Sequence, residues 1–415
     1  MIISRILIEA KNYIYILKNI SNRLTVEFIN QLSVIITLPI IANSLGINSF
    51  AIVSQGMILI HLILLISSWG IDGYSIERLN NSNDIKQRNL IINTFILTRL
   101  SLTLFFVIIL FVFLKSNFIK LNLEYFWYML FPIIASSFLP LWFFQAIGKP
   151  EKLLLPTLIG RFIFIILIFL FLKNDNSVNW FFISHGISSS IISLFGILIL
   201  FKMDYKVKLI NFKNIIYYLK ESNNHFFLLI VNNQFNTLWA TAIIFVGSST
   251  SIAIFNLANQ ILKAGMGISE LVGRVIRQST YLKEINHLKK IIIIISFLYF
   301  LISIFFIYTL RDILKIFFIS DYLLHIVIFQ IIIVIWFFNA VFKLLSYSFI
   351  TKILDIKKAN KTSIRIGLIH VLFVFLWLVF SSSYNVFSIS VYMMLACFFQ
   401  FLTLVIYIKL AKKID

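Results

Sequence analysis

Long apolar segments, about twelve of them, follow one another along the chain from residue 24 to residue 409. Each segment is long enough for a helix to cross ~30 Å of hydrocarbon. Inside a bilayer every backbone N–H and C=O group must be bonded within the protein, so segments of this length are expected to be helices. The composition agrees, because 60% of the residues are hydrophobic and only 13% are charged. We therefore expect an all-α polytopic membrane protein.

The boundaries of the expected helices follow from the apolar runs. Four prolines lie inside or at the edges of these runs, where each removes a helical hydrogen bond and permits a bend: Pro39, Pro132, Pro140 and Pro156. The expected spans are residues 24–45, 49–70, 90–114, 124–147, 153–172, 178–201, 225–246, 251–272, 291–310, 322–350, 362–381 and 387–409.

Lysine and arginine are divided unequally between the two sets of connections. With the N-terminus in the cytoplasm, about 27 of the 36 Lys and Arg residues lie in the cytoplasmic connections and tails, and only about five lie in the opposite loops. The positive-inside rule therefore places both termini in the cytoplasm. Because the formal net charge of +20 resides in short loops that would face anionic lipid, it indicates no nucleic acid partner.

The sequence lacks the patterns of metal, cofactor and nucleophile chemistry. The single cysteine, Cys397, excludes an intramolecular disulfide and any site built from several cysteines. The six histidines are scattered without metal-ligand spacing, and phosphate-binding glycine loops and nucleophile elbows are absent. We expect no metal, no cofactor and no enzymatic activity.

The two halves of the chain carry similar short motifs. An Asn-Gln pair at residues 30–31 and a glycine at Gly46 have counterparts at residues 233–234 and at Gly247. A repeat of six spans keeps both halves in one orientation, related by an axis along the membrane normal. This pattern predicts two pseudo-symmetric six-helix lobes around a central cleft. The expected lobes are residues 1–212 and residues 213–415.

Four cations lie inside the expected spans: Arg99, Arg161, Lys263 and Lys343. Ionisable residues within a membrane are costly and often mark a functional site. Arg99 lies ~14 Å along its span, and its guanidinium could donate two parallel hydrogen bonds to a diphosphate. The alternative for Arg99 is an ion pair with an acid on another span, such as Glu27.

The other three cations also have two interpretations. Lys263 lies ~18 Å along its span, on a helix face that carries amides and glycines. Arg161 and Lys343 lie nearer to the cytoplasmic ends of their spans. Each of the three could bind an anionic substrate, and each could instead extend its charged end toward water.

Amide side chains accompany the cations and could bind sugar hydroxyls. Asn30 and Gln31 lie in the first span, one turn from Glu27, which is the candidate to take up and release a coupling ion. Four amides of the seventh span cover most of a helix circumference, so some of them should face the cleft, although packing between helices is the alternative for each. These four are Asn232, Asn233, Gln234 and Asn236.

The stretch LPLWFFQAIGKPE at residues 139–151, with Gly-Arg-Phe at residues 160–162, resembles the fourth and fifth spans of Wzx-type O-antigen flippases. These flippases form a polysaccharide-exporter branch of the superfamily that includes the multidrug and toxin extruders (MATE). Further agreement lies in residues 38–51, in WGID at residues 69–72 and in IFNLANQ at residues 254–260. The chain departs from the family pattern in two places. Ala146 stands where a glycine often follows the family glutamine, and residues 277–280 stand where a proline often ends span eight.

The resemblance implies a flippase that translocates an undecaprenyl-pyrophosphate-linked oligosaccharide, an O-antigen or capsule repeat unit, across the bacterial cytoplasmic (inner) membrane by alternating access. The implied partners are membrane lipids and, as a candidate, a polysaccharide polymerase. The alternatives are a MATE-like multidrug exporter and a membrane-embedded polysaccharide polymerase or glycosyltransferase. Deeply placed positive charges favour an anionic substrate over a cationic drug. A polymerase would be expected to carry a sizeable outward loop, which this sequence lacks.

Overall fold

The computed structural model describes residues 2–411 except residues 83, 204, 207–210, 234–237, 280–284 and 347–355. Side chains are described from Ile29 onward, except those of residues 212, 232, 268, 271, 274–279, 285–289, 356–360 and 410–411. The described chain is almost entirely helical and contains no strand. The expected all-α fold is therefore confirmed.

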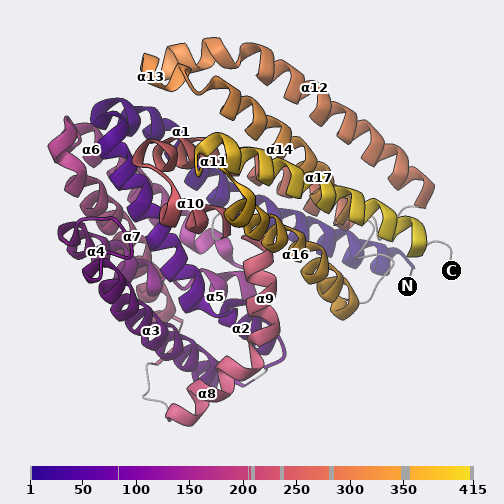
Figure 1. The fold of residues 1–415 in the computed structure, drawn as a ribbon. Coiled ribbons are helices and arrows are strands. Elements are labelled where there is room, and N and C mark those ends of the chain that lie inside the picture. The colour runs from indigo at the N-terminus through magenta and orange to yellow at the C-terminus, as the bar shows by residue number, and fades with distance from the viewer. Residues whose placement is uncertain are drawn as a thin grey trace.

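The first half of the chain forms a bundle of long helices (Figure 1). Its long members are α1 (Ile2–Ser68), α3 (Ile85–Lys115), α4 (Leu123–Ser137), α6 (Leu154–Phe171) and α7 (Val178–Phe201). Short elements connect them: α2 (Ile71–Asn80), α5 (Leu141–Ala146), and the 3₁₀ turns Pro150–Leu153 and Asp175–Ser177.

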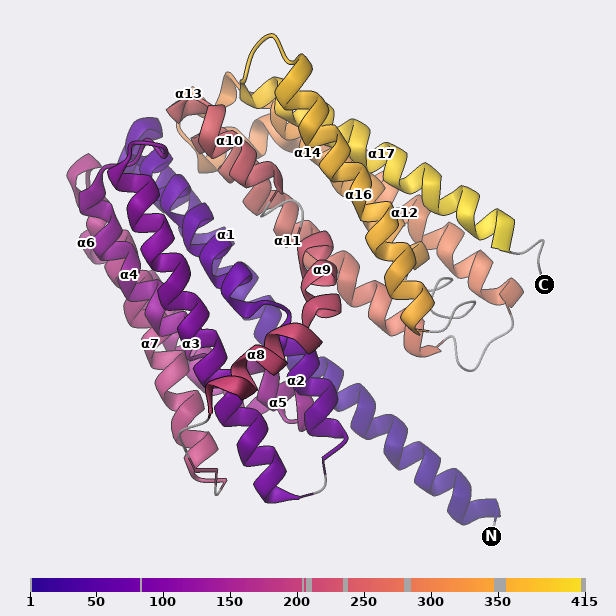
Figure 2. The same ribbon diagram turned by 60° about the horizontal axis from the view of Figure 1, so that its bottom comes forward.

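The second half forms another bundle, which lies beside the first (Figure 2). It begins with three short helices, α8 (Phe212–Glu221), α9 (Asn223–Asn232) and α10 (Ala240–Val246). The remaining helices are α11 (Ser249–Ser279), α12 (Ile285–Phe317), α13 (Ser320–Leu323), α14 (Ile326–Leu345), α16 (Ile356–Phe380) and α17 (Val386–Ala411). Helices α1 and α11 pack against each other and join the bundles.

Glycine and proline set the main breaks in the first bundle. Helix α1 contains two expected spans, and its direction changes at Gly46, whose φ of 64° and ψ of 175° favour a residue without Cβ. Pro140 separates α4 from α5 within the fourth expected span. The helices continue through Pro39 and Pro132, so these two prolines do not end them.

Nine segments of the described chain are long and apolar enough to cross a membrane. The first of them, Ile29–Ser68, holds two of the expected spans. Within the seventh expected span, α9 ends at Asn232 and α10 begins at Ala240, and residues 234–237 between them lie outside the described part of the chain. The multi-pass character is confirmed, whereas the number twelve and the lobe boundary at residues 212–213 stay predictions.

Large apolar side chains lie on the outer surface of the bundles. On α3, Phe105 and Ile108 are exposed, and α12 exposes Phe297 and Phe305 in the same way. At the same time polar side chains such as Asn256 are buried inside. An apolar exterior of this extent fits contact with lipid rather than with water.

Contacts between the bundles occur at three levels along the molecule. At the end where α1 bends, which we call the Gly46 end, the Asn43 amide donates to the Phe317 carbonyl at 2.8 Å and accepts from the Ile319 N–H at 3.1 Å. In the middle, Asn256 donates to the Ser54 hydroxyl at 3.0 Å.

The third level lies at the opposite end, which we call the α8 end. There the Trp69 indole donates to the Asn223 side chain at 3.1 Å and stacks on Phe226 with ring centroids 4.2 Å apart. Gly70, with φ of 68°, allows this approach, because a Cβ there would lie 2.3 Å from the Phe226 nitrogen. Helix α9 of the second bundle is thereby held against the first.

Candidate functional site

Two of the predicted site residues meet between α1 and α6. The Arg161 Nε donates a hydrogen bond to the Asn30 Oδ1 at 2.7 Å. Both side chains are half-buried, so they face the interior of the structure without being sealed from solvent. The sequence placed these residues in separate spans and predicted no contact between them.

Further polar groups surround His61 on α1. This imidazole lies within electrostatic range of Lys263 on α11, of His185 on α7 and of Arg161. We call Asn30, His61, Arg161, His185 and Lys263 the cationic cluster. It draws side chains from both bundles.

The cationic cluster lies near the middle of the helices that form it. Counted at about 1.5 Å per residue, Asn30 lies ~24 Å before Gly46 and His61 lies ~22 Å after it. Lys263 lies ~21 Å from the start of α11, which begins at the same end of the molecule (Figure 2). The cluster therefore lies inside the bundles, with His61 ~10 Å before the end of α1 at Ser68 and about twice as far from Gly46.

No acid balances the charge of the cluster among the residues that the structure describes. Neither Arg161 nor Lys263 forms an ion pair with a described Asp or Glu. A cation inside a membrane protein without an anionic partner is costly unless water or a ligand reaches it. The half-buried state of both side chains provides that access. The arrangement can therefore hold an anion, with Arg161 supplying directional donors and Lys263 a point charge.

Gln31 lies beside the face of α11 that carries Lys263. A Cβ built on Gly267 would lie 3.8 Å from the Gln31 Cγ and 3.9 Å from its Nε2. Gly267 follows Lys263 by one helical turn, so both residues lie on one face of α11. Gln31 is thus placed beside the cluster, as an amide that could bind a hydroxyl group.

Arg99 is paired with an acid. Its Nη1 donates to the Asp72 Oδ1 at 3.0 Å, and the two side chains are 13% and 34% exposed. This is the ion pair that the sequence left open as an alternative, with Asp72 on α2 as the acid that the structure describes. A role of Arg99 in binding substrate stays a prediction.

Lys343 is also paired. Its Nζ donates to the Glu270 carboxylate, which links α14 to α11 inside the second bundle. This ion pair neutralises the charge of Lys343, for which the sequence allowed either substrate binding or extension toward water. A substrate contact of Lys343 stays a prediction.

The amides of the seventh expected span are only partly described. Asn233 donates through its side chain to the Leu229 carbonyl at 2.9 Å, at the end of its own helix α9. The other predicted residues of this group lie outside the described part: Gln234 and Asn236 entirely, and Asn232 in its side chain. The side chain of Glu27, the candidate for ion coupling, also lies outside it.

No feature of the sequence marks His61 or His185 as a site residue. The two residues lie on different helices, 124 positions apart, and show no motif. His185 packs against Phe164 and Phe181, and its Nδ1 is buried without a hydrogen-bond partner in the described part of the chain. Only the packing of α1 against α7 reveals that these imidazoles belong with the cluster.

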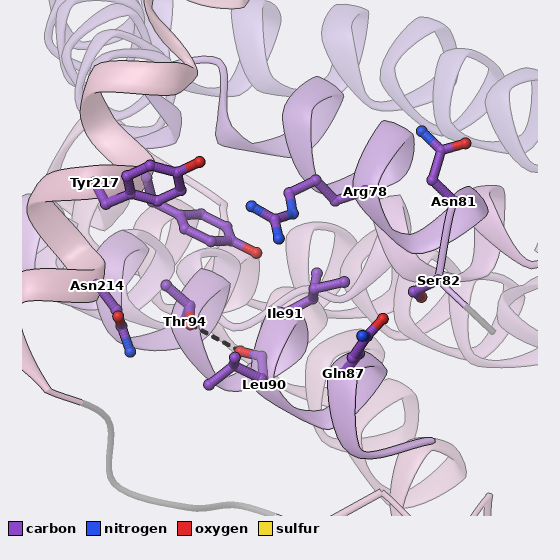
Figure 3. Close-up of a pocket in the computed structure, with 10 residues that line it drawn as sticks. Arg78, Asn81, Ser82, Gln87, Leu90, Ile91, Thr94, Asn214 and Tyr217 are labelled. Atoms are coloured by element: carbon purple, nitrogen blue, oxygen red, sulfur yellow. Dashed lines mark hydrogen bonds between the residues drawn. The ribbon is translucent and has the colours of Figure 1, made fainter. Parts of the chain in front are cut away.

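A separate pocket of about 450 Å³ lies at the α8 end, between α2, α3 and α8 (Figure 3). Arg78 and Tyr217 enter it from opposite sides (Figure 3). Burial raises the pKa of the Tyr218 phenol, although Arg78 nearby lowers it, so this hydroxyl remains neutral. The lining residues are Arg78, Asn81, Ser82, Gln87, Leu90, Ile91, Thr94, Asn214, Tyr217 and Tyr218. None of them was predicted as a site residue.

Comparison with known families finds one match. The family described as "Polysaccharide biosynthesis protein" matches residues 16–276. This range includes every residue of the cationic cluster. None of the curated protein sequences compared with the chain matches it significantly.

Solved structures show the same fold at low sequence identity. A lipid II flippase, MurJ, in an inward closed conformation has a TM-score of 0.69 at 15% identity, over 96% of this chain and 87% of that one. An inward-facing multidrug resistance transporter of the MATE family has a TM-score of 0.63 at 15% identity, over 94% and 96% of the two chains. A transporter of the same MOP superfamily from Pyrococcus furiosus gives 0.54 at 14% identity, over 96% of each chain. The family match confirms the resemblance noted at residues 139–151, and these solved structures share the fold of the chain.

Proposed function

Because this chain belongs to the polysaccharide biosynthesis protein family, we propose that it is a flippase for a lipid-linked oligosaccharide. The substrate carries an undecaprenyl pyrophosphate and an O-antigen or capsule repeat unit. It crosses the bacterial cytoplasmic membrane from the inner to the outer leaflet by alternating access. Both termini and the α8 end face the cytoplasm in this proposal, in accordance with the positive-inside rule.

The observation that carries the proposal is the cationic cluster, to which the described residues contribute no acid. A lipid-linked oligosaccharide has a tail that can stay in the bilayer, a sugar head that cannot, and a pyrophosphate that needs cations on its route. Arg161, already oriented by Asn30, and Lys263 would bind the pyrophosphate. Gln31 and the two imidazoles would contact the polar groups beside it.

The other predicted residues have conditional or auxiliary roles in this proposal. Arg99 and Lys343 would contact the substrate only if their ion pairs with Asp72 and Glu270 opened during the cycle. The seventh-span amides would bind sugar hydroxyls. Glu27 is kept as a candidate for ion coupling, and a polysaccharide polymerase as a candidate partner.

The two lobes, residues 1–212 and 213–415, would move as units around the cluster. Opening toward the outside would separate Asn43 from α12 and its following loop, whereas opening toward the cytoplasm would separate Trp69 from α9. Both sets of contacts are formed in the present structure. In this proposal the present structure is an intermediate of the cycle in which neither set of contacts has opened.

A multidrug exporter is the closest alternative in fold. A site for cationic drugs would be expected to present acids, and the cationic cluster presents none among the described residues. A polymerase or glycosyltransferase is disfavoured by the short outward connections of the sequence. The charge of the site thus favours an anionic lipid-linked substrate.

The test uses cells that lack the protein and compares lipid-linked saccharides with surface polysaccharide. The proposal expects complete repeat units to accumulate on lipid and surface polymer to disappear. Wild-type protein and a Lys173→Gln variant, altered at an exposed site, should restore export, and Arg161→Gln should not. Single units reaching the surface unpolymerised would instead indicate a polymerase, and an unchanged saccharide profile would direct the search to drug export.

A further inference from the structure

The pocket at the α8 end is lined by hydrogen-bonding groups and by one cation. Its described lining residues are the cation Arg78, two phenols, three amides, two hydroxyls and two apolar side chains, and none of them is Asp or Glu. Both hydroxyls already donate within the protein. Ser82 bonds to the Leu79 carbonyl at 2.9 Å, and Thr94 bonds to the Leu90 carbonyl at 2.8 Å, as Figure 3 shows for Thr94. The guanidinium, the phenols and the amides are the donors that remain for a ligand, and they suit an anion.

Arg78 is held in position by its neighbour Tyr74. The Arg78 Nη1 donates to the Tyr74 phenol oxygen at 3.1 Å, and the Arg78 Cζ lies 5.8 Å from the centroid of the same ring. This bond uses one of the five N–H donors of the guanidinium, and the others can bind two oxygens of one anionic group side by side. Arg78 forms no ion pair with an acid that the structure describes, and the adjacent Glu77 lies 3.5 Å from the His225 Nε2 instead.

Tyr218 supplies a buried phenol that a ligand could engage. The residue is 5% exposed, and its hydroxyl forms no hydrogen bond with a described residue. The Tyr74 ring packs edge-on against it, with ring centroids 5.1 Å apart and an interplanar angle of 83°, so the phenol is fixed in place. A buried hydroxyl without a partner is unfavourable, and an acceptor oxygen in the pocket would relieve that cost.

The pocket lies at the boundary between hydrocarbon and headgroups. Helix α3 has 31 residues and is ~46 Å long, so about 8 Å would extend beyond ~30 Å of hydrocarbon at each end if the helix is centred. The lining residues of α3 run from Gln87, ~3 Å from the start of the helix, to Thr94, ~14 Å from it. Leu90 lines the pocket and is exposed, and so is Ile216 beside the lining residue Tyr217. The pocket therefore adjoins apolar surface as well as water.

Helix α8 has the pattern of a helix that lies at a membrane surface. Its residues Ile215 and Tyr218 are buried, whereas Lys213 and Lys220 are exposed. Basic pockets in this position bind the headgroups of anionic lipids. A soluble anion would gain nothing from the apolar surface beside the pocket, so the combination favours a ligand with both a phosphate and acyl chains.

We propose that the pocket at the α8 end binds the phosphate headgroup of an acidic phospholipid. Arg78 and Tyr218 donate to the phosphate oxygens, and the acyl chains lie along the apolar outer face of α3. The proposal goes beyond the proposed function, because it holds whatever the protein transports. Helices α2 and α3 belong to the first bundle, and α8 begins the second half of the chain and packs against both. A bound lipid would therefore stabilise the connection between the two halves.

The first test measures binding of phosphatidylglycerol to the purified full-length protein by native mass spectrometry, with phosphatidylcholine as the zwitterionic comparison. Wild type should bind phosphatidylglycerol more tightly. Arg78→Gln should weaken this binding about 10- to 100-fold, because it removes a charge-assisted bond, and Arg78→Lys should weaken it less. Lys213→Gln is the matched control. It removes one charge from the same end of the molecule at a residue that does not line the pocket, and its binding should stay within about twofold of wild type.

Tyr218→Phe separates binding of a ligand from a structural role of the hydroxyl. It should weaken phosphatidylglycerol binding about 2- to 10-fold, the effect of one neutral hydrogen bond. Without the lipid it should unfold at the same temperature as wild type or higher, since it removes a buried hydroxyl that has no described partner. A lower unfolding temperature with unchanged lipid binding would overturn the role of Tyr218. If Arg78→Gln does not fold, Arg78→Lys and Tyr218→Phe carry the test.

Four results would overturn the proposal. Equal binding of phosphatidylcholine, or equal losses in Lys213→Gln and Arg78→Gln, would show general attraction to the membrane instead of a site. Displacement of the lipid by inorganic phosphate at equal concentration would identify a site for a soluble anion. Displacement by a short-chain polyprenyl pyrophosphate, with a loss of transport in Arg78→Gln, would assign the pocket to the transported substrate. If the flippase proposal fails while phosphatidylglycerol binding still depends on Arg78, the lipid site stands alone.

Discussion

The Arg161→Gln variant best distinguishes a role of Arg161 in substrate binding from a purely structural role. The substitution removes the positive charge and the Nε donor that bonds to Asn30. A charge-assisted hydrogen bond contributes about 1.5–3 kcal/mol. Since 1.4 kcal/mol corresponds to a factor of ten, we expect the affinity for a polyprenyl pyrophosphate to fall about 10- to 100-fold.

Stability should behave differently. Among the described residues, removing Arg161 leaves no acid unpaired. The loss of the bond to Asn30 destabilises the protein, whereas removal of a half-buried cation that has no described anionic partner stabilises it. We expect these effects to offset each other, with a net change in unfolding free energy of about 1 kcal/mol or less.

The assay is binding of a short-chain polyprenyl pyrophosphate to purified protein, with thermal unfolding measured on the same samples. Arg161→Lys keeps the charge and loses the planar donor geometry, so its affinity should lie between those of wild type and Arg161→Gln. Lys173→Gln removes an exposed charge and should leave both quantities unchanged. Unchanged affinity in Arg161→Gln, or a large loss of stability with normal affinity, would refute the assignment of Arg161 to the substrate.

Three further predictions concern contacts outside the cationic cluster. Arg99→Gln should destabilise the protein by roughly 1–3 kcal/mol in thermal unfolding, since it leaves Asp72 unpaired in a half-buried site, and Asp72→Asn in the same chain should recover part of the loss. Gly70→Ala should weaken the contact between α2 and α9, because its Cβ would meet the Phe226 nitrogen at 2.3 Å, and a cysteine cross-link between the two helices should form in lower yield. Asn256→Ala removes a buried bond between the bundles, and we expect a loss of about 0.5–1.5 kcal/mol in the same unfolding assay.

The fold was largely predictable because a membrane leaves few choices. Apolar length determined the helices, and prolines and glycines indicated several of their breaks. Gly46 shows what the sequence could not determine. It separates two expected spans, but the sequence did not show that the two helical parts meet at a sharp kink at Gly46, with a non-helical φ of 64° and no longer loop between them.

The candidate site was predictable in residue type but not in pairing. The sequence identified Arg161, Lys263 and Asn30 because charges and amides are unusual in apolar segments. It treated Arg99 as comparable with Arg161, although Arg99 is paired with Asp72 and Arg161 forms no ion pair with an acid that the structure describes. Pairing depends on which helix faces lie together, and a periodic apolar pattern does not determine that.

The contacts between the two bundles indicate where a rocking motion would pivot. The hydrogen bonds of Asn43 at one end and of Trp69 at the other are exposed, so water can replace their partners at little cost. The bond between Asn256 and Ser54 in the middle is buried, where an unpaired donor or acceptor would cost about 1–3 kcal/mol. A motion that keeps this central bond and alternately breaks the two exposed ends therefore costs least. Such a pivot leaves α1 and α11 in contact and exposes the cationic cluster to one side of the membrane at a time.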